Sequence, residues 1–385
     1  MNDNITPYVR YIGADDKDLD LFESQYVVPQ GISYNSYVIT DEKIAVMDTI
    51  DQRKTDEWTA RLEEALEGRT PDYLIVQHME PDHAANIGWF AEKYPEATIV
   101  ASAKAIQMMP QFFEEVNFAG RTQTVKEGDT LCLGQHTLKF IMAPMVHWPE
   151  VMLTYEESEK ILFSADAFGK FGALCHEGEW IDEARRYYFN IVGKYGAQVQ
   201  ALLKKAAGLD IAMIWPILKE NLGYYIGLYD TWSKYEPETE GVVVAYASIH
   251  GNTAAVARRM AEILSEKGAA EVMLIDLCRD DMALAVESAF RYSKMIVAAS
   301  SYDAGVFPPM FDFLHHLQIK NFQKRRVGII ENGSWAPTAG RMMSCMLSEM
   351  KNMEIMEHMV TIKSSMKKAD LLQMEELAEE LLATE

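Results

Sequence analysis

Residues 73–83 read YLIVQHMEPDH, and this stretch decides how the rest of the chain is interpreted. Its first four residues are apolar and rich in β-formers, and the run is too short for a helix, so we predict a buried strand. Two histidines and two carboxylates follow within six residues: His78, Glu80, Asp82 and His83. Imidazoles and carboxylates form a mixed nitrogen and oxygen ligand set, which suits zinc, iron or manganese. A polar loop with two incidental histidines is the alternative, but it would leave these charges unneutralised at considerable cost.

Two later apolar runs end in residues of the same kind. His147 follows the strand-like residues 137–141, and Asp166 ends the run ILFSAD at residues 161–166. Alone, each would be an ordinary loop residue. Together with the first cluster they indicate a binuclear site, in which Asp166 is able to bridge two ions.

The pattern H-x-E-x-D-H, followed by a distant His and then an Asp, resembles the metallo-β-lactamase-like domain of flavodiiron proteins. In the zinc hydrolases of that fold the second motif position is usually His, whereas here it is Glu80. A harder oxygen ligand moves the preference from zinc toward iron. The resemblance implies one iron on His78, Glu80, His147 and the bridging Asp166, and a second on Asp82, His83 and Asp166.

The last iron ligand of that family comes from a P-x-H-G-P-like segment shortly before the linker. The corresponding residues 211–221 read IAMIWPILKEN, contain no histidine and are a few residues shorter. His176 is a conceivable replacement, although nothing in its spacing argues for it. The sequence therefore leaves the second iron undecided between an open position, a weaker site, and a ligand supplied by water or another residue.

The composition of the chain limits its possible binding partners and its cellular compartment. The chain has 385 residues, enough for two or three domains, and a formal net charge of -22, which disfavours nucleic acid and anionic membranes. The N-terminus has neither the basic nor the apolar region of a signal peptide, and no apolar stretch approaches membrane-spanning length. The four cysteines are scattered and form no CxxC pair, which favours the cytoplasm and excludes a fused rubredoxin or a cysteine-ligated cluster.

The two halves of the chain have different patterns of predicted strands and helices. Residues 1–235 read as short strands, turns and helices, with a hairpin at 36–48, a helix at 55–67 and a broken helical stretch at 183–207. A polar stretch containing Pro and Gly around residues 233–241 marks the domain boundary. Residues 236–385 alternate strands and helices, with strands at 242–246, 272–275, 295–299 and 327–330 and helices at 253–267 and from about 339. We therefore expect an α/β protein, with a metallo-β-lactamase-like αβ/βα sandwich before a flavodoxin-like, doubly wound parallel sheet.

Residues 246–253, YASIHGNT, join the first strand of the second half to its first helix. Small and hydroxyl residues there let backbone N–H groups wrap a phosphate at a helix N-terminus, although an ordinary capped turn would look similar. Two other strand ends, SSYDAGVFPP at 300–309 and ENGSWA at 331–336, each offer an aromatic residue that can flank a planar ring.

This half resembles flavodoxin, whose phosphate loop has the form S-x-x-G-N-T, and the resemblance implies FMN. The phosphate loop would contribute Ser248, Ile249, His250, Gly251, Asn252 and Thr253. The isoalloxazine would lie among Ser301, Tyr302, Asp303, Ala304, Gly305, Asn332, Gly333, Ser334 and Trp335.

With both halves included, the likeness to flavodiiron proteins covers essentially the whole chain. It implies a reductase in which a separate donor, such as a rubredoxin or a reduced deazaflavin, feeds electrons through FMN to a binuclear iron site. That site would reduce dioxygen to water or nitric oxide to nitrous oxide, and the sequence does not rank the two. A head-to-tail homodimer, or a dimer of dimers, would bring FMN near the metals of another chain. Two alternatives stay open: a β-lactamase-like hydrolase, against which Glu80 argues, and a metal-impaired flavoprotein that only carries electrons.

Overall fold

The computed structural model describes residues 4–175, 180–215 and 221–383, which form two compact units. The first unit comprises the residues up to Tyr188 together with Ala197–Tyr229, and the second comprises Phe189–Gly196 together with Asp230–Glu385. The predicted boundary between residues 235 and 236 stays a prediction, and the units change over at Asp230 and around the short segment Phe189–Gly196. Both units mix helices with sheets, which confirms the predicted α/β class.

Two sheets stack in the first unit and enclose its core. The six-stranded sheet has the order β1 (Val9–Tyr11), β6 (Tyr37–Thr40), β7 (Ile44–Met47), β8 (Tyr73–Val76), β9 (Thr98–Ser102) and β10 (Thr122–Val125). The five-stranded sheet has the order β11 (Thr130–Cys132), β12 (Thr137–Met142), β13 (Met152–Glu156), β14 (Ile161–Phe163) and β15 (Met213–Trp215). Apolar side chains of both sheets, such as Val100 and Phe140, meet in one buried cluster. The short pairs β2 (Ala14–Asp16) with β5 (Ile32–Tyr34) and β3 (Leu21–Phe22) with β4 (Tyr26–Val27) complete the strands.

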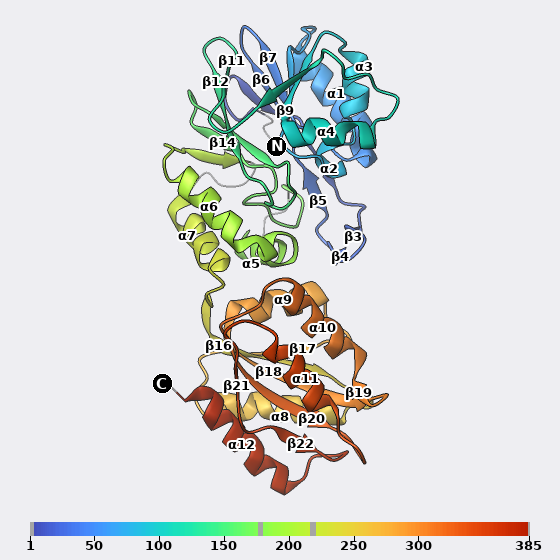
Figure 1. Ribbon diagram of the computed structural model, residues 1–385, viewed down its shortest axis with the longest axis vertical. Coiled ribbons are helices and arrows are strands. Elements are labelled where there is room, and N and C mark those ends of the chain that lie inside the picture. The colour runs from blue at the N-terminus through green and yellow to red at the C-terminus, as the bar shows by residue number, and fades with distance from the viewer. Residues whose placement is uncertain (1–3, 176–179, 216–220, 384–385) are drawn as a thin grey trace. The chain divides into compact units, whose positions relative to one another are not determined.

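Helices pack against this sandwich. α1 (Thr55–Leu66) packs on β6, and α4 (Ala103–Phe112) packs on β9 and β10, with α3 (Ile87–Lys93) nearby (Figure 1). α1 buries Trp58, Leu62, Ala65 and Leu66, whose spacing places them on one helix face. The predicted hairpin and this helix are therefore confirmed. The predicted helical stretch is confirmed as α5 (Trp180–Tyr187), a π-helix (Tyr188–Val192), a 3-10 helix (Gly193–Tyr195) and α6 (Gly196–Ala206), and α7 (Leu222–Ser233) follows.

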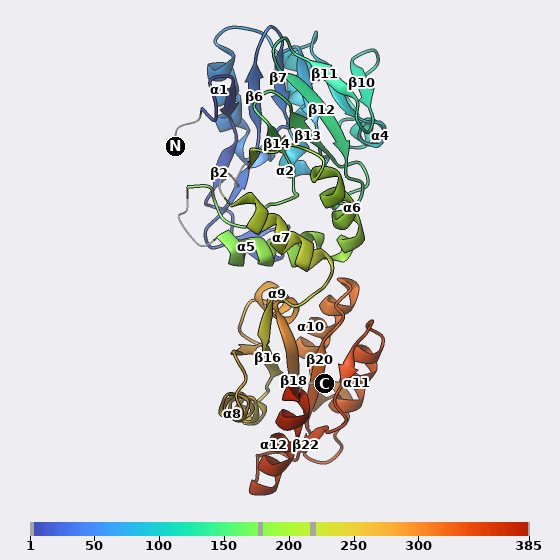
Figure 2. The same ribbon diagram turned by 90° about the vertical axis from the view of Figure 1, so that its left-hand side faces the viewer.

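The second unit is a doubly wound sheet. Its parallel strands have the order β17 (Val272–Asp276), β16 (Thr239–Ala247), β18 (Tyr292–Tyr302), β20 (Arg326–Asn332) and β21 (Glu354–Ile355). A further strand, β22 (Val360–Ile362), also pairs with β20. The short strand β19 (Gly305–Val306) runs antiparallel to β18. α8 (Asn252–Glu266) and α12 (Lys368–Leu382) share one core cluster, and α9 (Met282–Arg291), α10 (Pro308–Ile319) and α11 (Ala339–Ser348) form the other group (Figure 2). In such a sheet ligands bind at the carboxyl ends of the strands, where the order of connection reverses.

No helix of the described residues combines the length and the apolar character that crossing a bilayer would require. The expected cytoplasmic location stays a prediction.

Candidate metal centre and flavin site

The turn after β8 directs its polar side chains inward because of its local sequence. Pro81 opens the one-turn helix α2 (Pro81–Ala84), where its fixed φ and missing N–H suit the first helical position. Glu80 precedes this helix with an extended backbone and makes no capping hydrogen bond. Its carboxylate instead lies beside the imidazoles of His78 and His147. Asp82 and His83 project from the helical turn itself.

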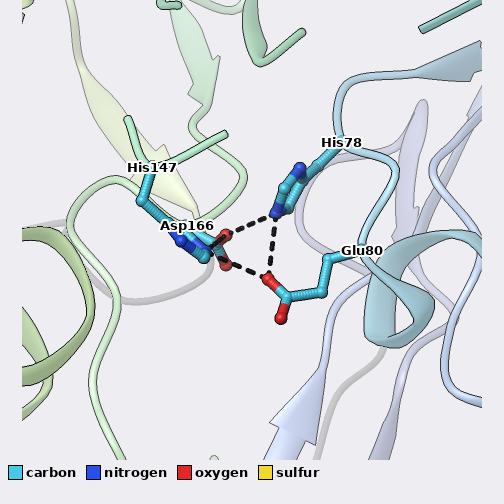
Figure 3. A group of neighbouring side chains, drawn as sticks. All are labelled: His78, Glu80, His147 and Asp166. Atoms are coloured by element: carbon cyan, nitrogen blue, oxygen red, sulfur yellow. Dashed lines mark hydrogen bonds and ion pairs between the residues drawn. The ribbon is translucent and has the colours of Figure 1, made fainter. Parts of the chain in front are cut away.

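Four side chains from three strand ends form the first ligand group, which Figure 3 shows. Nε2 of His78 lies 3.0 Å from Oδ2 of Asp166 and 3.2 Å from Oε2 of Glu80. Nε2 of His147 lies 3.0 Å from Oε2 of Glu80 and 3.3 Å from Oδ2 of Asp166. The ligand atoms all lie within 4.8 Å of one another, so one ion can contact all four.

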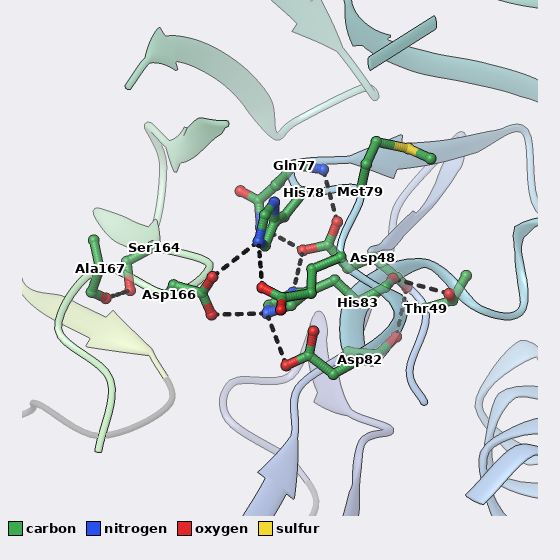
Figure 4. A network of polar contacts seen from close by, with 12 residues as sticks. Asp48, Thr49, Gln77, His78, Met79, Asp82, His83, Ser164, Asp166 and Ala167 are labelled. Carbon is green, nitrogen blue, oxygen red and sulfur yellow. Dashed lines mark hydrogen bonds and ion pairs between the residues drawn. The ribbon is translucent and has the colours of Figure 1, made fainter. Parts of the chain in front are cut away.

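Asp166 also belongs to a second ligand group, together with Asp82 and His83 (Figure 4). Nε2 of His83 lies 3.1 Å from Oδ1 of Asp166 and 4.0 Å from Oδ2 of Asp82. The first group faces Oδ2 of Asp166 and the second group faces Oδ1. This is the geometry of a carboxylate that bridges two ions.

Unpaired atoms support the fit of a metal pair. Oδ2 of Asp166, Nε2 of His147 and Oδ1 of Asp82 are buried without a hydrogen-bond partner among the residues that the structure describes. Imidazole nitrogens lie near Oδ2 of Asp166, but not in hydrogen-bond geometry. Buried polar atoms are seldom left unpaired in native proteins. The donor set of imidazoles and carboxylates, without a thiolate, fits hard or borderline divalent ions such as iron.

The electrostatics of the cluster favour cations. Burial, together with the nearby Asp166 and Glu80 carboxylates, raises the pKa of Asp82 to about 7. Burial lowers the pKa of His83, but the Asp166 and Asp82 carboxylates outweigh it and hold that pKa well above its ordinary value. Burial also lowers the pKa of His147, but the contacts with the Asp166 and Glu80 carboxylates outweigh it and raise that pKa to about 9. Without metal, the imidazoles therefore hold protons as counter-charges, and metal binding displaces those protons.

The fourth ligand of the second group is the point at which the sequence departs from the ligand pattern that it resembles. β15 runs parallel to β14 with Trp215 opposite Phe163, so the two strands end side by side, near Asp166. Residues 216–220, which follow Trp215, lie outside the described residues, as does His176. Of the described residues, only Asp82, His83 and Asp166 make up the second group.

Sequence reasoning did not single out Asp48 and Glu150, whose buried carboxylates contact His83 and His78. Asp48 directly follows β7, so a carboxylate at a strand end was a signal that was available. Glu150 lies three residues after His147, and nothing local distinguishes it. A cavity of about 40 Å³ also borders Asp82, His83 and Asp166, and Tyr34 and Tyr187 are among the residues that line it.

The predicted flavin residues gather around one pocket of about 600 Å³ at the carboxyl ends of β16, β18 and β20, a size typical of ligand sites. Every predicted residue lines it except Gly251 and Gly305, which lie in the same loops. Four further residues line the pocket: Ser300 and Ala336, from the strand-end stretches that the sequence indicated, and Thr338 and Ser364, which it did not suggest. Trp335 is 91% exposed and Tyr302 45% exposed, so both rings are available to flank a planar ligand.

The phosphate loop has the backbone that its sequence predicts. Gly251 has a φ of +91° and precedes α8, a conformation that favours glycine. Its N–H donates to Oγ of Ser248 at 3.1 Å, and the hydroxyls of Thr253 and Ser300 lie 2.9 Å apart. Loop N–H groups and hydroxyls therefore border the pocket at the start of a long helix, where an anion is favoured.

Comparison with known proteins places this geometry in a family. A family model described as ODP family beta lactamase matches residues 32–216. The chain is 30% identical to an uncharacterized protein of Methanocaldococcus jannaschii over 80% of each chain. It is 28% identical to the anaerobic nitric oxide reductase flavorubredoxin of Aliivibrio fischeri, over 87% of this chain and 70% of that protein. It is 32% identical to diflavin flavoprotein A 2 of Synechocystis sp., over 71% of this chain, and spans about half (49%) of that longer protein.

The fold has solved counterparts. The rubredoxin oxygen:oxidoreductase of Desulfovibrio gigas matches with a TM-score of 0.91 and 24% identity, over 98% of this chain and 97% of that one. Fold, ligand pattern and relatives agree. The chain belongs to the flavodiiron protein family, a family of oxidoreductases that bind FMN and a diiron centre.

Proposed function

We propose that this chain is a flavodiiron reductase, which takes electrons from a separate donor and reduces dioxygen to water, nitric oxide to nitrous oxide, or both. When bound, FMN converts between one-electron and two-electron steps, and paired irons bind and polarise a small substrate. The sharing of Asp166 between two ligand groups carries the proposal. A simple electron carrier has no need of two adjacent groups joined through one carboxylate. Against a zinc hydrolase stands Glu80, at the position where such enzymes usually have a histidine.

The chain's own residues would hold these cofactors. His78, Glu80, His147 and Asp166 would hold one iron, and Asp82, His83 and Asp166 the other. Glu80 is the oxygen ligand that separates this set from the histidine-richer zinc hydrolases. In the second unit, the loop Ser248–Thr253 would hold the FMN phosphate, with Tyr302 and Trp335 beside the ring.

The second iron would be held more weakly than the first. Its group has three described ligands, whereas the first has four. A position with fewer protein ligands keeps room for water and releases its ion more readily. A chelator should therefore strip the metal in two phases, and turnover should fall with the first phase.

The electron donor and the assembly follow from the composition and from the placement of the two sites. The chain offers no thiolate centre of its own, so a rubredoxin or a reduced deazaflavin is the class of donor we expect. The metal ligands lie in one unit and the flavin pocket in the other. We expect a head-to-tail homodimer, or a dimer of such dimers, to pair the FMN of one chain with the metals of its partner.

Metal analysis combined with anaerobic turnover tests the proposal. Protein expressed with iron and reconstituted with FMN should contain both cofactors and consume dioxygen or nitric oxide with reduced rubredoxin. Rates for the two substrates, measured on one preparation, would rank them. Zinc alone, with hydrolase activity and no oxygen or nitric oxide consumption, would instead support the hydrolase. FMN reduction without consumption of either gas would support the simple carrier.

A further inference from the structure

His78, which follows β8, and His83, on α2, each contact a buried carboxylate on the ring nitrogen that faces away from the candidate ligand groups. Nδ1 of His78 lies 2.8 Å from Oε1 of Glu150, and neither side chain is exposed. Nδ1 of His83 lies 3.3 Å from Oδ2 of Asp48 (Figure 4). The other ring nitrogen, Nε2, faces Asp166 in both residues.

This arrangement selects which nitrogen is available to a metal. Nδ1 of each ring lies at the outer carboxylate, whereas Nε2 lies among the ligand groups, so an ion bound there would take Nε2 and leave Nδ1 to donate its hydrogen to the carboxylate. The lone pair then resides on Nε2, the nitrogen that faces the ligand group. Such outer carboxylates orient ligating imidazoles and make them more basic.

Both carboxylates are anchored independently of the histidines. Oε1 of Glu150 also accepts the backbone N–H of Met79 at 2.9 Å, and the backbone carbonyl of Glu150 accepts the hydroxyl of Ser102 at 2.8 Å. Asp48 accepts the backbone N–H of Gln77 at 2.7 Å and its side-chain amide at 3.1 Å. The acceptors are therefore in place before a metal arrives.

We infer that Glu150 and Asp48 are positioning residues with separate duties, Glu150 acting through His78 on the first ion and Asp48 acting through His83 on the second. The inference rests on the proposed metal centre and extends it beyond its ligands. The contact between Glu150 and His78 is shorter than the contact between Asp48 and His83, and Glu150 is the more fully buried carboxylate. The imidazole of His78 is therefore held more rigidly than the imidazole of His83. This asymmetry acts in the same direction as the smaller number of ligands around the second ion.

A double-mutant cycle on the full-length chain tests the inference through metal affinity, measured by Co²⁺ titration of its visible absorption. Glu150→Gln should weaken Co²⁺ binding by about 10- to 100-fold in the otherwise unchanged chain. In a His78→Ala background the same substitution should change affinity by less than about threefold, because its route to the metal is gone. In a His83→Ala background its full effect should persist. Asp48→Asn should show the mirror pattern, with His83→Ala removing its effect.

Matched controls exist in the same unit. Glu156 is a fully buried carboxylate on β13 that accepts backbone N–H groups from Ser158 and Glu159 and belongs to neither ligand group. Asp41 pairs with His136 at 2.8 Å and likewise belongs to neither group. Glu156→Gln and Asp41→Asn should leave Co²⁺ affinity and the absorption spectrum unchanged.

The outcomes separate the inference from the proposed function. Unchanged affinity in Glu150→Gln and Asp48→Asn, equal losses in every background, or equal losses in the controls would overturn the inference alone. A wild-type chain that takes up no Co²⁺ or iron would overturn both. Where Glu150→Gln does not fold, Glu150→Asp, which keeps the charge but shortens its reach, should show the same dependence on His78.

Discussion

Asp166 is the residue on which the two ligand groups converge. Its two oxygens face different groups, so its loss should affect both ions, whereas loss of His147 should affect only the first. We predict that Asp166→Asn lowers the affinity of both positions by more than the roughly 10- to 100-fold typical of an outer-shell partner. Elemental analysis after dialysis against a chelator measures this. Asp210, whose side chain is 80% exposed, provides the control Asp210→Asn, which should retain full metal content. Retention of one tightly held ion in Asp166→Asn would contradict the bridging role.

Gly251 gives the phosphate loop its left-handed backbone. A Cβ at this position would meet no atom within 4 Å, so the cost of Gly251→Ala is conformational, about 1–2 kcal/mol for a left-handed backbone. Relief of that strain would shift the N–H groups of the phosphate loop. FMN affinity, followed by fluorescence titration of the apoprotein, should fall by roughly 5- to 30-fold.

Gly268 is the matched control for this experiment. It has the same φ of +91° and the same open surroundings, but it lies at the other end of α8. Gly268→Ala should therefore cost similar stability and leave FMN affinity unchanged. Equal losses of affinity in the two variants would show that the effect comes from general destabilisation and not from the loop.

At the scale of elements, buried polar contacts hold the turns of the two stacked sheets together. Asp41 lies in the turn between β6 and β7, and His136 lies in the turn between β11 and β12. The Asp41 carboxylate accepts a hydrogen bond from the backbone N–H of His136 at 2.7 Å and another from its ring N–H at 2.8 Å. The amide of Lys43 also donates to the carbonyl of Leu133 at 2.8 Å. These contacts join neighbouring hairpins, and none of these residues belongs to either candidate ligand group.

Asp41 should make this junction sensitive to acid. Burial raises the pKa of Asp41, but the ring and backbone N–H groups of His136 outweigh it, so the pKa lies below its ordinary value. The ionised carboxylate therefore stabilises the fold fully above the ordinary pKa of about 3.9, and this contribution disappears as pH falls through the lower folded-state pKa. Asp41→Asn should lower the free energy of unfolding by about 1–3 kcal/mol at pH 7, measured by urea unfolding. The difference in the free energy of unfolding between this variant and the wild type should become smaller below about pH 4. A difference that stays constant with pH would refute this account.

At the scale of the whole molecule, the second unit uses residues from before the predicted boundary. Nη1 of Arg325, a buried residue, donates to the carbonyl of Tyr235 at 2.8 Å. Phe189 stacks on Phe290, with ring centroids 4.3 Å apart. A fragment that starts at residue 241 lacks these partners and also the first two residues of β16.

Two fragments test this dependence. Residues 230–385 and residues 241–385 should both be yellow and release FMN on denaturation, because both contain the whole flavin pocket. The shorter fragment should melt several degrees lower, since a buried guanidinium loses an acceptor. Equal melting temperatures would show that the preceding segment contributes little. A folded fragment of either length that takes up no added FMN would refute the flavin site.

The chain as a whole should depend on an external electron donor. Its four cysteines are free and lie on β11, on α11 and in two separate loops, so they cannot form the four-thiolate site of a rubredoxin. With NADH as the only addition, an oxygen electrode should record no rapid multiple turnover. Addition of reduced rubredoxin or reduced deazaflavin should start it. Rapid turnover with NADH alone would contradict this prediction.

Much of the fold was predictable because local chain properties determine it. Apolar runs of four or five residues bounded by turns gave β8, β16, β17 and the core of β18, and the polar stretch near residue 235 lies close to the change between units. The departures are at the edges of elements, where β18 runs on to Tyr302 and a π-helix replaces a simple break near Gly193. Element ends depend on tertiary contacts more than on propensity.

His78, Glu80, Asp82 and His83 could be picked out as candidate ligands from the sequence, because they follow one strand and a strand end is where side chains can converge. The tertiary structure was needed to show that Asp166 presents one oxygen to each group, and that Glu150 and Asp48 contact the two histidines. These contacts join residues 72 and 35 positions apart, so sheet register and the stacking of two sheets set them. Local spacing carries no information about such distances, because the same sequence motif would fit any partner that packing brought within reach.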